Sequence, residues 1–306
     1  MDKPVKFVLS TAIMGQMWPE QWREILDYSD QILEEQGISA KTGLELVAAF
    51  REPLFSLVIE RLHRLGVAGR VEAVHGRVDY DFEAYRGRLD HFPGLKKLEI
   101  TAFDMLMPLV GETYRATKKL PNAKLLLHAP TLFQLASLKG KKPRLWGKRL
   151  IIENDEKLTP TAAMQKWGDP LNPVDVYKFA QARGLSKMVF DTAHFWRVYS
   201  NKIQRQTLWQ EFKEVANENV PIYWHLNRAN DGWFAIGRTK LGYESEHDAW
   251  LAEVCSVIGA RMSKISDQVC LEEPRQVLLR LSRRQMEERK QGITRVVKCL
   301  REYEVF

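Results

Sequence analysis

The sequence has few cysteines and lacks a long apolar segment. Its 306 residues include three cysteines, Cys255, Cys270 and Cys299, which are widely spaced and odd in number. This pattern argues against a disulfide framework and for a reducing cytoplasm. None lies in a Cys-x-x-Cys pair, so we do not expect a zinc site built from thiolates. Because no run of about 20 uncharged apolar residues occurs, we expect no membrane span.

Targeting and linker signals are also missing from the sequence. The first residues do not combine a basic stretch with a long apolar region, so we expect no signal peptide and a cytoplasmic protein. Neither a low-complexity tract nor a long Gly/Ser linker divides the chain. Hydrophobic residues make up 45% of it, enough for one large core. A single α/β barrel is compatible with this length, since such barrels reach about 200–250 residues or more.

Positive charge exceeds negative charge, with a formal net charge of +7. Much of the excess lies in residues 139–149, 178–187 and 275–301. A basic surface could favour phosphates or nucleic acid. Glutamates interleave with the basic residues of the C-terminal stretch, however. We therefore favour a solvated helix surface of mixed charge as the interpretation of that stretch.

Short apolar runs alternate with helical patterns along the chain. This alternation predicts repeated βα units and a parallel sheet, here a (β/α)8 TIM barrel. The fourth strand has two candidates, Lys97–Ala102 and Leu125–His128, and we prefer the second because three successive leucines indicate a strand buried on both faces. The other predicted strands are Lys6–Ala12, Gly43–Ala49, Arg70–His75, Arg149–Glu153, Lys187–Asp191, Pro221–His225 and Gln268–Glu272.

Helices are expected between the strands. Three of them begin near a proline and end before a glycine, which are typical start and stop signals: Pro19–Gln36, Pro53–Leu65 and Pro173–Arg183. Residues 130–149 are rich in Lys, Gly and Pro, so we expect a loop there. Residues 1–274 would form the barrel. Residues 275–306 would form a helical extension, as one long helix or two shorter ones, packed on the barrel or on a second copy in a homo-oligomer.

Residues able to bind metal close six of the predicted strands. The carboxyl ends of parallel strands meet at one mouth of a barrel, where active sites lie, so these side chains should converge. Imidazoles and carboxylates together suit zinc, manganese or iron, and a bridging carboxylate can hold two ions roughly 3.5–4 Å apart. Taken singly, each of these residues could instead be a hydrogen-bonded or ion-paired core residue. The six residues are His75, His128, Glu153, Asp191, His225 and Glu272.

Four segments, in this order, resemble the xylose isomerase-like TIM-barrel superfamily. This superfamily contains sugar isomerases, epimerases, some lyases and dehydratases, and endonuclease IV. The resemblance covers roughly residues 5–273, through short motifs only. The segments are Ile151-Ile152-Glu153-Asn154, Phe190-Asp191-Thr192-Ala193-His194-Phe195, His225-Leu226-Asn227 and Leu271-Glu272.

The resemblance implies roles for individual residues. The shared set of metal ligands is matched by Glu153, Asp191, His225 and Glu272. His75 and His128 match the two histidines that, with the bridging glutamate, hold a second ion in endonuclease IV. His194 matches a position that binds a third ion there and lies near the substrate in sugar enzymes. Glu45 matches a second-strand glutamate, for which a structural pair inside the barrel is an equally good interpretation.

The chain also departs from the endonuclease IV pattern. That enzyme carries an Asp-x-His motif after its His-Leu-Asn motif, which completes the third metal site, whereas residues 234–242 here contain neither Asp nor His. The next histidine, His247, falls where a helix should begin. Asn227 is followed by Arg228, at a position where an aspartate is common. We expect Arg228, Arg238, Lys240 and Trp233 near the mouth, where they would suit an anionic substrate.

Three functions remain open at this point. We prefer a metal-dependent isomerase or epimerase of a sugar or sugar phosphate, in which Glu153 and Glu272 remove and return a proton and His194 orients a hydroxyl. The second is a phosphodiesterase that resembles endonuclease IV and cuts abasic-site DNA with two ions. The extra histidines favour it, and the missing Asp-x-His argues against it. The third is a barrel that binds metal or ligand without turnover.

Overall fold

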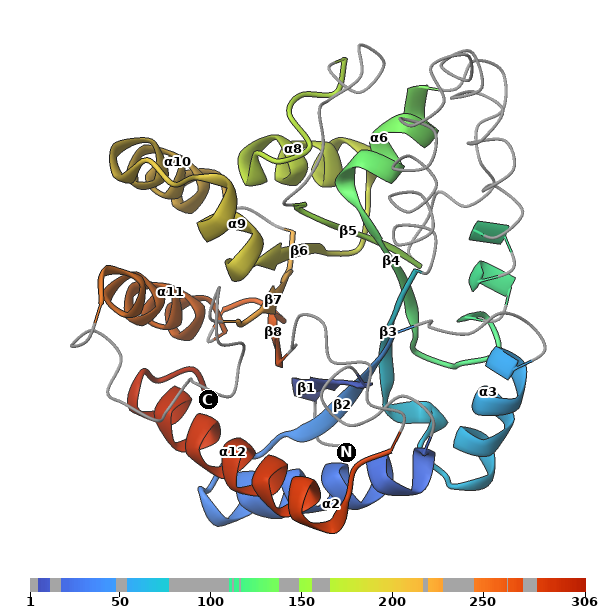
Figure 1. Ribbon diagram of the computed structural model, residues 1–306. Helices are drawn as coiled ribbons and strands as arrows, with labels where there is room; N and C mark the ends of the chain where they lie inside the picture. Colours follow the sequence, from blue (N-terminus) through green and yellow to red (C-terminus); the bar gives the residue numbers. More distant parts are fainter. Residues whose placement is uncertain are drawn as a thin grey trace.

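The computed structural model shows a closed barrel of eight parallel strands in chain order (Figure 1). It describes residues 5–11, 18–47, 54–76, 110–111, 113–115, 117–137, 149–155, 166–216, 220–227, 245–262, 264–271 and 280–306. The strands are β1 (Val5–Ser10), β2 (Lys41–Val47), β3 (Val71–His75), β4 (Lys124–His128), β5 (Leu150–Glu153), β6 (Met188–Asp191), β7 (Ile222–His225) and β8 (Gln268–Leu271).

Helices surround this barrel, as the ring in Figure 1 shows. The helices are α2 (Pro19–Glu35), α3 (Leu54–Arg64), the 3-10 turn η1 (Ala68–Arg70), α6 (Ala129–Ser137), α8 (Pro173–Arg183), α9 (Thr192–Val198), α10 (Lys202–Val215), α11 (Glu246–Met262) and α12 (Arg283–Glu302). The predicted (β/α)8 TIM barrel is therefore confirmed. Among the described helices, none has both the length and the apolar character that a membrane span requires.

The predicted strands agree with the structure to within two residues at the ends that can be compared. For the fourth strand, Leu125–His128 was the right candidate, since β4 pairs with β3 and β5. The rejected candidate, Lys97–Ala102, lies outside the described residues. The expected loop at residues 130–149 is wrong in part, because α6 occupies Ala129–Ser137. Pro130 is its second residue, a position where the missing N–H of proline has no intrahelical partner to lose.

Alternation along each strand separates an inner from an outer apolar layer. In β4, Leu126 belongs to the cluster inside the barrel, while Leu125 and Leu127 belong to the cluster between strands and helices. A period of two residues causes this division, since successive side chains point to opposite faces. Seven of the strands contribute one residue each to the inner layer: Val8, Ala73, Leu126, Ile151, Val189, Tyr223 and Cys270.

The C-terminal helix α12 lies beside α2, as Figure 1 shows at the lower edge of the ring. Ser282 and Gln285 form a capping box at its start, which satisfies free N–H groups of the first turn. The Tyr28 hydroxyl lies 2.9 Å from the Thr294 hydroxyl, and Lys290 binds Glu24 across the same contact. The C-terminal segment therefore packs on the barrel in this chain. A boundary at residue 274 and a homo-oligomer stay predictions.

Candidate metal centre

Five of the six predicted ligands are the last residues of five consecutive strands, β3 to β7. All five side chains are buried, and two of them, Glu153 and His225, have no exposed surface. Neighbouring strands hold them at one level, since His128 pairs with Glu153 and Asp191 pairs with His225 in the register. The five residues are His75, His128, Glu153, Asp191 and His225.

Each of these residues follows the inner-layer residue of its own strand by two positions. Ile151 fills the barrel interior, for example, and Glu153 is the next residue on the same face of β5. The same spacing joins Tyr223 to His225 in β7. Alternation along the strand therefore directs the metal-capable side chains inward, directly above the apolar layer.

One oxygen of Glu153 faces two histidines. Glu153 Oε2 lies 3.2 Å from His75 Nε2 and 3.3 Å from His128 Nε2. The two imidazole rings meet edge to face, with centroids 5.0 Å apart. The ligand atoms of these three residues all lie within 4.8 Å of one another, a spacing that could hold one metal ion.

The other oxygen of Glu153 faces a second group. Glu153 Oε1 lies 2.8 Å from His225 Nδ1, which in turn lies 3.7 Å from Asp191 Oδ2. These three residues form another set whose ligand atoms lie within 4.8 Å of one another. Glu153 thus belongs to both groups and stands between them.

Hydrogen bonds behind the ring of His225 show which nitrogen faces Glu153 with a lone pair. His225 Nε2 lies 3.0 Å from Glu45 Oε2, and an ionised carboxylate can only accept, so Nε2 carries the proton. In a neutral ring, Nδ1 then points a lone pair at a negative oxygen 2.8 Å away. Such a contact is repulsive unless the ring takes up a second proton or a cation binds beside the two atoms.

The oxygens of Glu153 lack well-aligned donors. Both are buried, and neither accepts a hydrogen bond of acceptable geometry from the residues that the structure describes. A buried carboxylate without partners is costly, and buried charges are normally paired or coordinate metals. Ligands about 2.1 Å from a common ion are separated by roughly 3.0 to 3.4 Å in octahedral and tetrahedral sites. The contacts of Glu153 Oε2 with His75 and His128, at 3.2 and 3.3 Å, lie in this range and fit a divalent cation, whereas the 2.8 Å contact with His225 is shorter.

The electrostatics of the centre keep its carboxylates ionised. Burial by itself would raise the pKa of Glu153, but His225, with His128 and His75, lowers that pKa well below its ordinary value. Burial also opposes ionisation of Asp191, and His194 and His225 lower its pKa nonetheless. Both carboxylates are thus ready to act as ligands at neutral pH.

Asp191 and His194 are positioned by the start of α9. Asp191 is the N-cap residue, and its Oδ1 accepts a hydrogen bond of 2.7 Å from the backbone N–H of His194. Asn227 Nδ2 donates to Asp191 Oδ2 over 3.3 Å, which holds that oxygen on the side of His225. The His194 ring donates from Nδ1 to the Asn154 carbonyl over 2.9 Å, so the lone pair of the neutral ring is on Nε2.

His194 also differs from the buried histidines in its exposure. Its side chain is partly exposed at the edge of the centre, and its ring meets the His128 ring edge to face with centroids 5.8 Å apart. Burial lowers the pKa of His194, but Asp191 and Glu153 raise it more, so the net shift is upward. In the metal-free centre, His194 therefore holds a proton more strongly than an ordinary imidazole does.

The sequence did not identify Asp155 and Gly76 as part of the centre, and it left two interpretations of Glu45 open. Asp155 is buried, and its Oδ2 lies 3.3 Å from His128 Nδ1. Glu45, for which a structural pair was the alternative, contacts His225 from β2. Gly76 follows His75, and a Cβ at Gly76 would come within 2.5 Å of Leu127 Cδ2 and 3.1 Å of the Leu126 carbonyl. A glycine there lets the end of β3 lie against β4.

Several predicted site residues lie outside the described residues. They are Glu272, Arg228, Arg238, Lys240 and Trp233. His247 is described and stands at the start of α11, as its place in the sequence predicted. There it stacks on Trp196 with ring centroids 4.2 Å apart. It belongs to the packing of α9 on α11.

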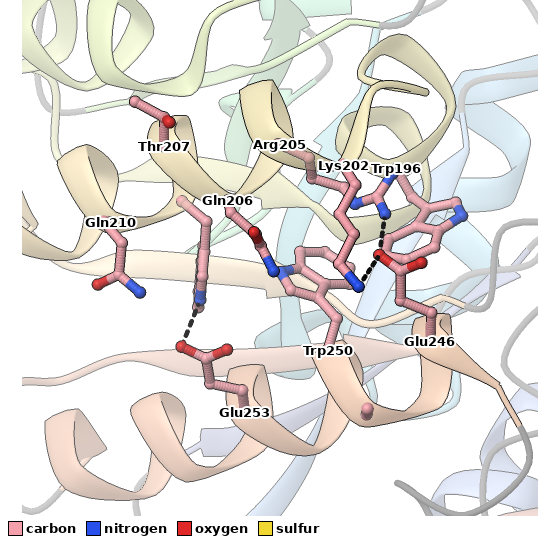
Figure 2. A pocket seen from close by; sticks show the side chains of 11 residues that line it. Trp196, Lys202, Arg205, Gln206, Thr207, Gln210, Glu246, Trp250 and Glu253 are labelled. Atoms are coloured by element: carbon pink, nitrogen blue, oxygen red, sulfur yellow. Dashed lines mark hydrogen bonds and ion pairs between the residues drawn. The ribbon is translucent and has the colours of Figure 1, made fainter.

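A groove of about 560 Å³ between α10 and α11 lies outside the barrel. Figure 2 shows that Lys202 and Arg205 turn toward Glu246. Arg205 Nη2 lies 2.6 Å from Glu246 Oε1, and Lys202 approaches the same oxygen at 3.8 Å. Glu253 accepts a hydrogen bond from Trp209 Nε1 over 2.9 Å. These contacts join the two helices, so we assign the groove to helix packing.

The sequence matches no protein-family model and no curated protein. The resemblance to the xylose isomerase-like superfamily therefore stays a prediction from the motifs, and the structure confirms the TIM barrel alone. The structure supports a TIM barrel whose mouth carries buried groups of His, Glu and Asp that could bind metal.

Proposed function

We propose that this chain is a metal-dependent phosphodiesterase with two divalent cations at the barrel mouth. The observation that carries the proposal is the position of Glu153, whose two oxygens face two different groups of ligand atoms. Two-ion hydrolytic sites use a carboxylate placed in this way between two groups of ligands, and their ions lie roughly 3.5–4 Å apart.

Each cation would have its own protein ligands besides the shared glutamate. His75 and His128 would hold one ion, and Asp191 and His225 the other. Glu272 would join the second set, as the superfamily resemblance implies. A mixture of imidazole and carboxylate ligands suits zinc, manganese or iron. When bound, such cations supply Lewis acidity, which activates water and offsets negative charge on phosphoryl oxygens.

His194 is the residue of this site that we propose to contact the reacting phosphate. Its ring is fixed through Nδ1, which leaves Nε2 to face the mouth. In this proposal the ring enters the reaction protonated, and Nε2 donates to the oxygen that leaves phosphorus. Water adds to phosphorus and releases a proton to the solvent, the phosphorus–oxygen bond breaks, and the Nε2 proton neutralises the departing alkoxide.

Nucleic acid is the substrate class that best fits this proposal. The net charge of +7 favours a polyanion, and the resemblance to endonuclease IV points to DNA with abasic sites. Sequence features expected to contact it are Arg228, Arg238, Lys240 and Trp233. These contacts stay predictions.

An isomerase or epimerase of a sugar or sugar phosphate is the second candidate. The observation in its favour is the lack of Asp-x-His in residues 234–242, which removes the third metal position of endonuclease IV. In this alternative Glu153 would exchange a proton with the substrate. Glu153 is fully buried and has three imidazoles within 2.8–3.3 Å, which leaves little room for a substrate C–H at its oxygens. We therefore rank this function below the phosphodiesterase.

The test compares Glu153 with Glu72, which lies near the start of β3 at the opposite end of the barrel. Wild type, Glu153→Gln and Glu72→Gln are loaded with Zn²⁺ or Mn²⁺ and offered an abasic-site oligonucleotide and, separately, ketoses and sugar phosphates in D₂O. We expect nicking by wild type and Glu72→Gln and its loss in Glu153→Gln. Deuterium entering a sugar without any nicking would support the isomerase and contradict the phosphodiesterase.

A further inference from the structure

We infer that Glu45 and Asp155 are positioning residues, each of which fixes one ligand histidine and thereby controls one of the two cation positions. The inference rests on the proposed two-cation site. It deepens that proposal because it assigns separate carboxylates to the two positions. Neither residue touches the oxygens of Glu153 in the contacts described above; each acts through the far nitrogen of a histidine.

Glu45 acts on His225 from across the barrel. It lies in β2, is fully buried, and its Oε2 accepts a hydrogen bond from His225 Nε2 over 3.0 Å. This bond fixes the tautomer that leaves the Nδ1 lone pair facing Glu153 Oε1. It also fixes the ring plane, because His225 then has a defined contact at each nitrogen.

Asp155 acts on His128 from the end of β5. Its Oδ2 lies 3.3 Å from His128 Nδ1, and its side chain is 4% exposed. With the proton on Nδ1, His128 presents the Nε2 lone pair to the position beside Glu153 Oε2, 3.3 Å away. The two histidines thus bind through different nitrogens, His128 through Nε2 and His225 through Nδ1.

A carboxylate is better suited to this role than an amide. An ionised carboxylate only accepts hydrogen bonds, so it enforces one tautomer, and its negative charge makes the imidazole a stronger ligand. An amide can turn its NH₂ group toward the ring and stabilise the opposite tautomer. The variants Glu45→Gln and Asp155→Asn therefore remove the negative charge and introduce a possible donor, while they nearly keep the shape of the side chain.

Cys270 lies close to Glu45 and His225, and the three together could be taken for another cation site. The hydrogen bond from His225 Nε2 to Glu45 argues against that interpretation, since a protonated nitrogen has no lone pair for a metal. Cys270 also belongs to the inner apolar layer of the barrel. Cys270→Ser is therefore a control that leaves both cation affinities unchanged.

The experiment measures stepwise binding of Zn²⁺ to wild type, Glu45→Gln, Asp155→Asn and Cys270→Ser by calorimetry. Each carboxylate variant should weaken one step by about 10- to 100-fold and leave the other nearly unchanged, since groups that hold ligand histidines typically contribute this much to affinity. The double variant should weaken both steps. Unchanged affinities, or equal weakening of both steps by each single variant, would overturn the inference.

Nitrogen NMR of the imidazoles gives a second readout that needs no metal. In the metal-free wild type, His225 should carry its proton on Nε2 and His128 on Nδ1. Glu45→Gln should alter the His225 pattern alone, and Asp155→Asn the His128 pattern alone. If wild type binds no cation, the proposed function fails. The tautomers then still decide whether Glu45 and Asp155 fix the two histidine rings. Wild-type tautomers opposite to these, or rings protonated on both nitrogens at neutral pH, would refute it.

Discussion

The two ends of the barrel carry polar layers of opposite character. At the amino end, Lys187 donates to Gln268 Oε1, and Gln268 Nε2 donates to Glu72 Oε2 over 2.9 Å. Lys124 lies close enough to Glu72 for their charges to interact. These donors and acceptors match one another. At the mouth, the oxygens of Glu153 face imidazole nitrogens without a well-aligned hydrogen bond among the described residues.

The difference shows how to separate a structural polar layer from a binding site. The layer at the mouth is buried and the amino-end layer is partly exposed, and both contain a glutamate and a hydrogen-bonded partner. The amino-end layer satisfies its own hydrogen bonds, so it is complete without a ligand. The layer at the mouth has no such closed set of hydrogen bonds among the described residues, as we expect of a site that binds cations.

The largest effect that we expect comes from the charge of Glu153. Glu153→Gln should weaken cation binding at both positions by more than about 100-fold, because one ligand of each group is lost, and even residues behind the ligands contribute about 10- to 100-fold. The metal content of each variant after dialysis measures this loss of cation binding. Glu72→Gln, the same change at the amino end, should retain its ions. An equal loss of bound metal in the two variants would contradict the distinction between the two ends of the barrel.

The next effect concerns the stabilisation of the fold by cations. Chelation should lower the unfolding temperature by roughly 4 °C for each ion held at 100 times its Kd, given the usual unfolding entropy of a chain of this length. Differential scanning calorimetry with and without chelator measures the shift. It should persist in Glu72→Gln and vanish in Glu153→Gln. A wild type that is indifferent to chelator would argue against cations at the mouth.

The amino end should show its own dependence on pH. Burial, with the charge of Lys124, lowers the pKa of Lys187 to about 8. In the unfolded chain this pKa is about 10.4, so the folded state binds fewer protons between these values and stability rises with pH across that window. The full difference corresponds to about 3 kcal/mol.

Lys187→Met tests this assignment. Denaturant unfolding between pH 7.5 and 10 should show a shallower rise in stability for the variant than for wild type. Cation affinity at the mouth should remain the same. A rise of equal slope in both proteins would show that Lys187 is not the responsible group.

The smallest effect is expected in the apolar layer between the two ends. The Tyr223 hydroxyl is buried and makes no well-formed hydrogen bond with the described residues. Tyr223→Phe should therefore change the free energy of unfolding by less than about 1 kcal/mol and leave cation affinity within about two-fold. A large loss of affinity would mean that the inner layer connects the two ends rather than separating them.

Periodicity was enough to predict the barrel and most of the centre. Apolar runs that end in His, Asp or Glu place those residues at one mouth, and His75, His128, Glu153, Asp191 and His225 do come together there. Alternation also held a signal for Asp155, two residues beyond Glu153, that the sequence analysis did not use. The helix at Ala129–Ser137 was missed because the Lys-, Gly- and Pro-rich composition of residues 130–149 favoured a loop.

Other features depend on contacts that one sequence does not reveal. Glu45 meets His225 across 180 residues of chain, so only the closed barrel shows which of its two interpretations holds. Gly76 matters because the backbone of β4 lies close to it, which is a property of strand pairing. The tautomers of His128 and His225 depend on the groups behind their rings.

Anomalous X-ray diffraction from crystals grown with Zn²⁺ or Mn²⁺ tests the central claim most directly. We expect two peaks at the Glu153 carboxylate, one beside His75 and His128 and the other beside Asp191 and His225. A map with no peak at Glu153 would contradict a cation site at the mouth, and a single peak would contradict the bridging role of this glutamate.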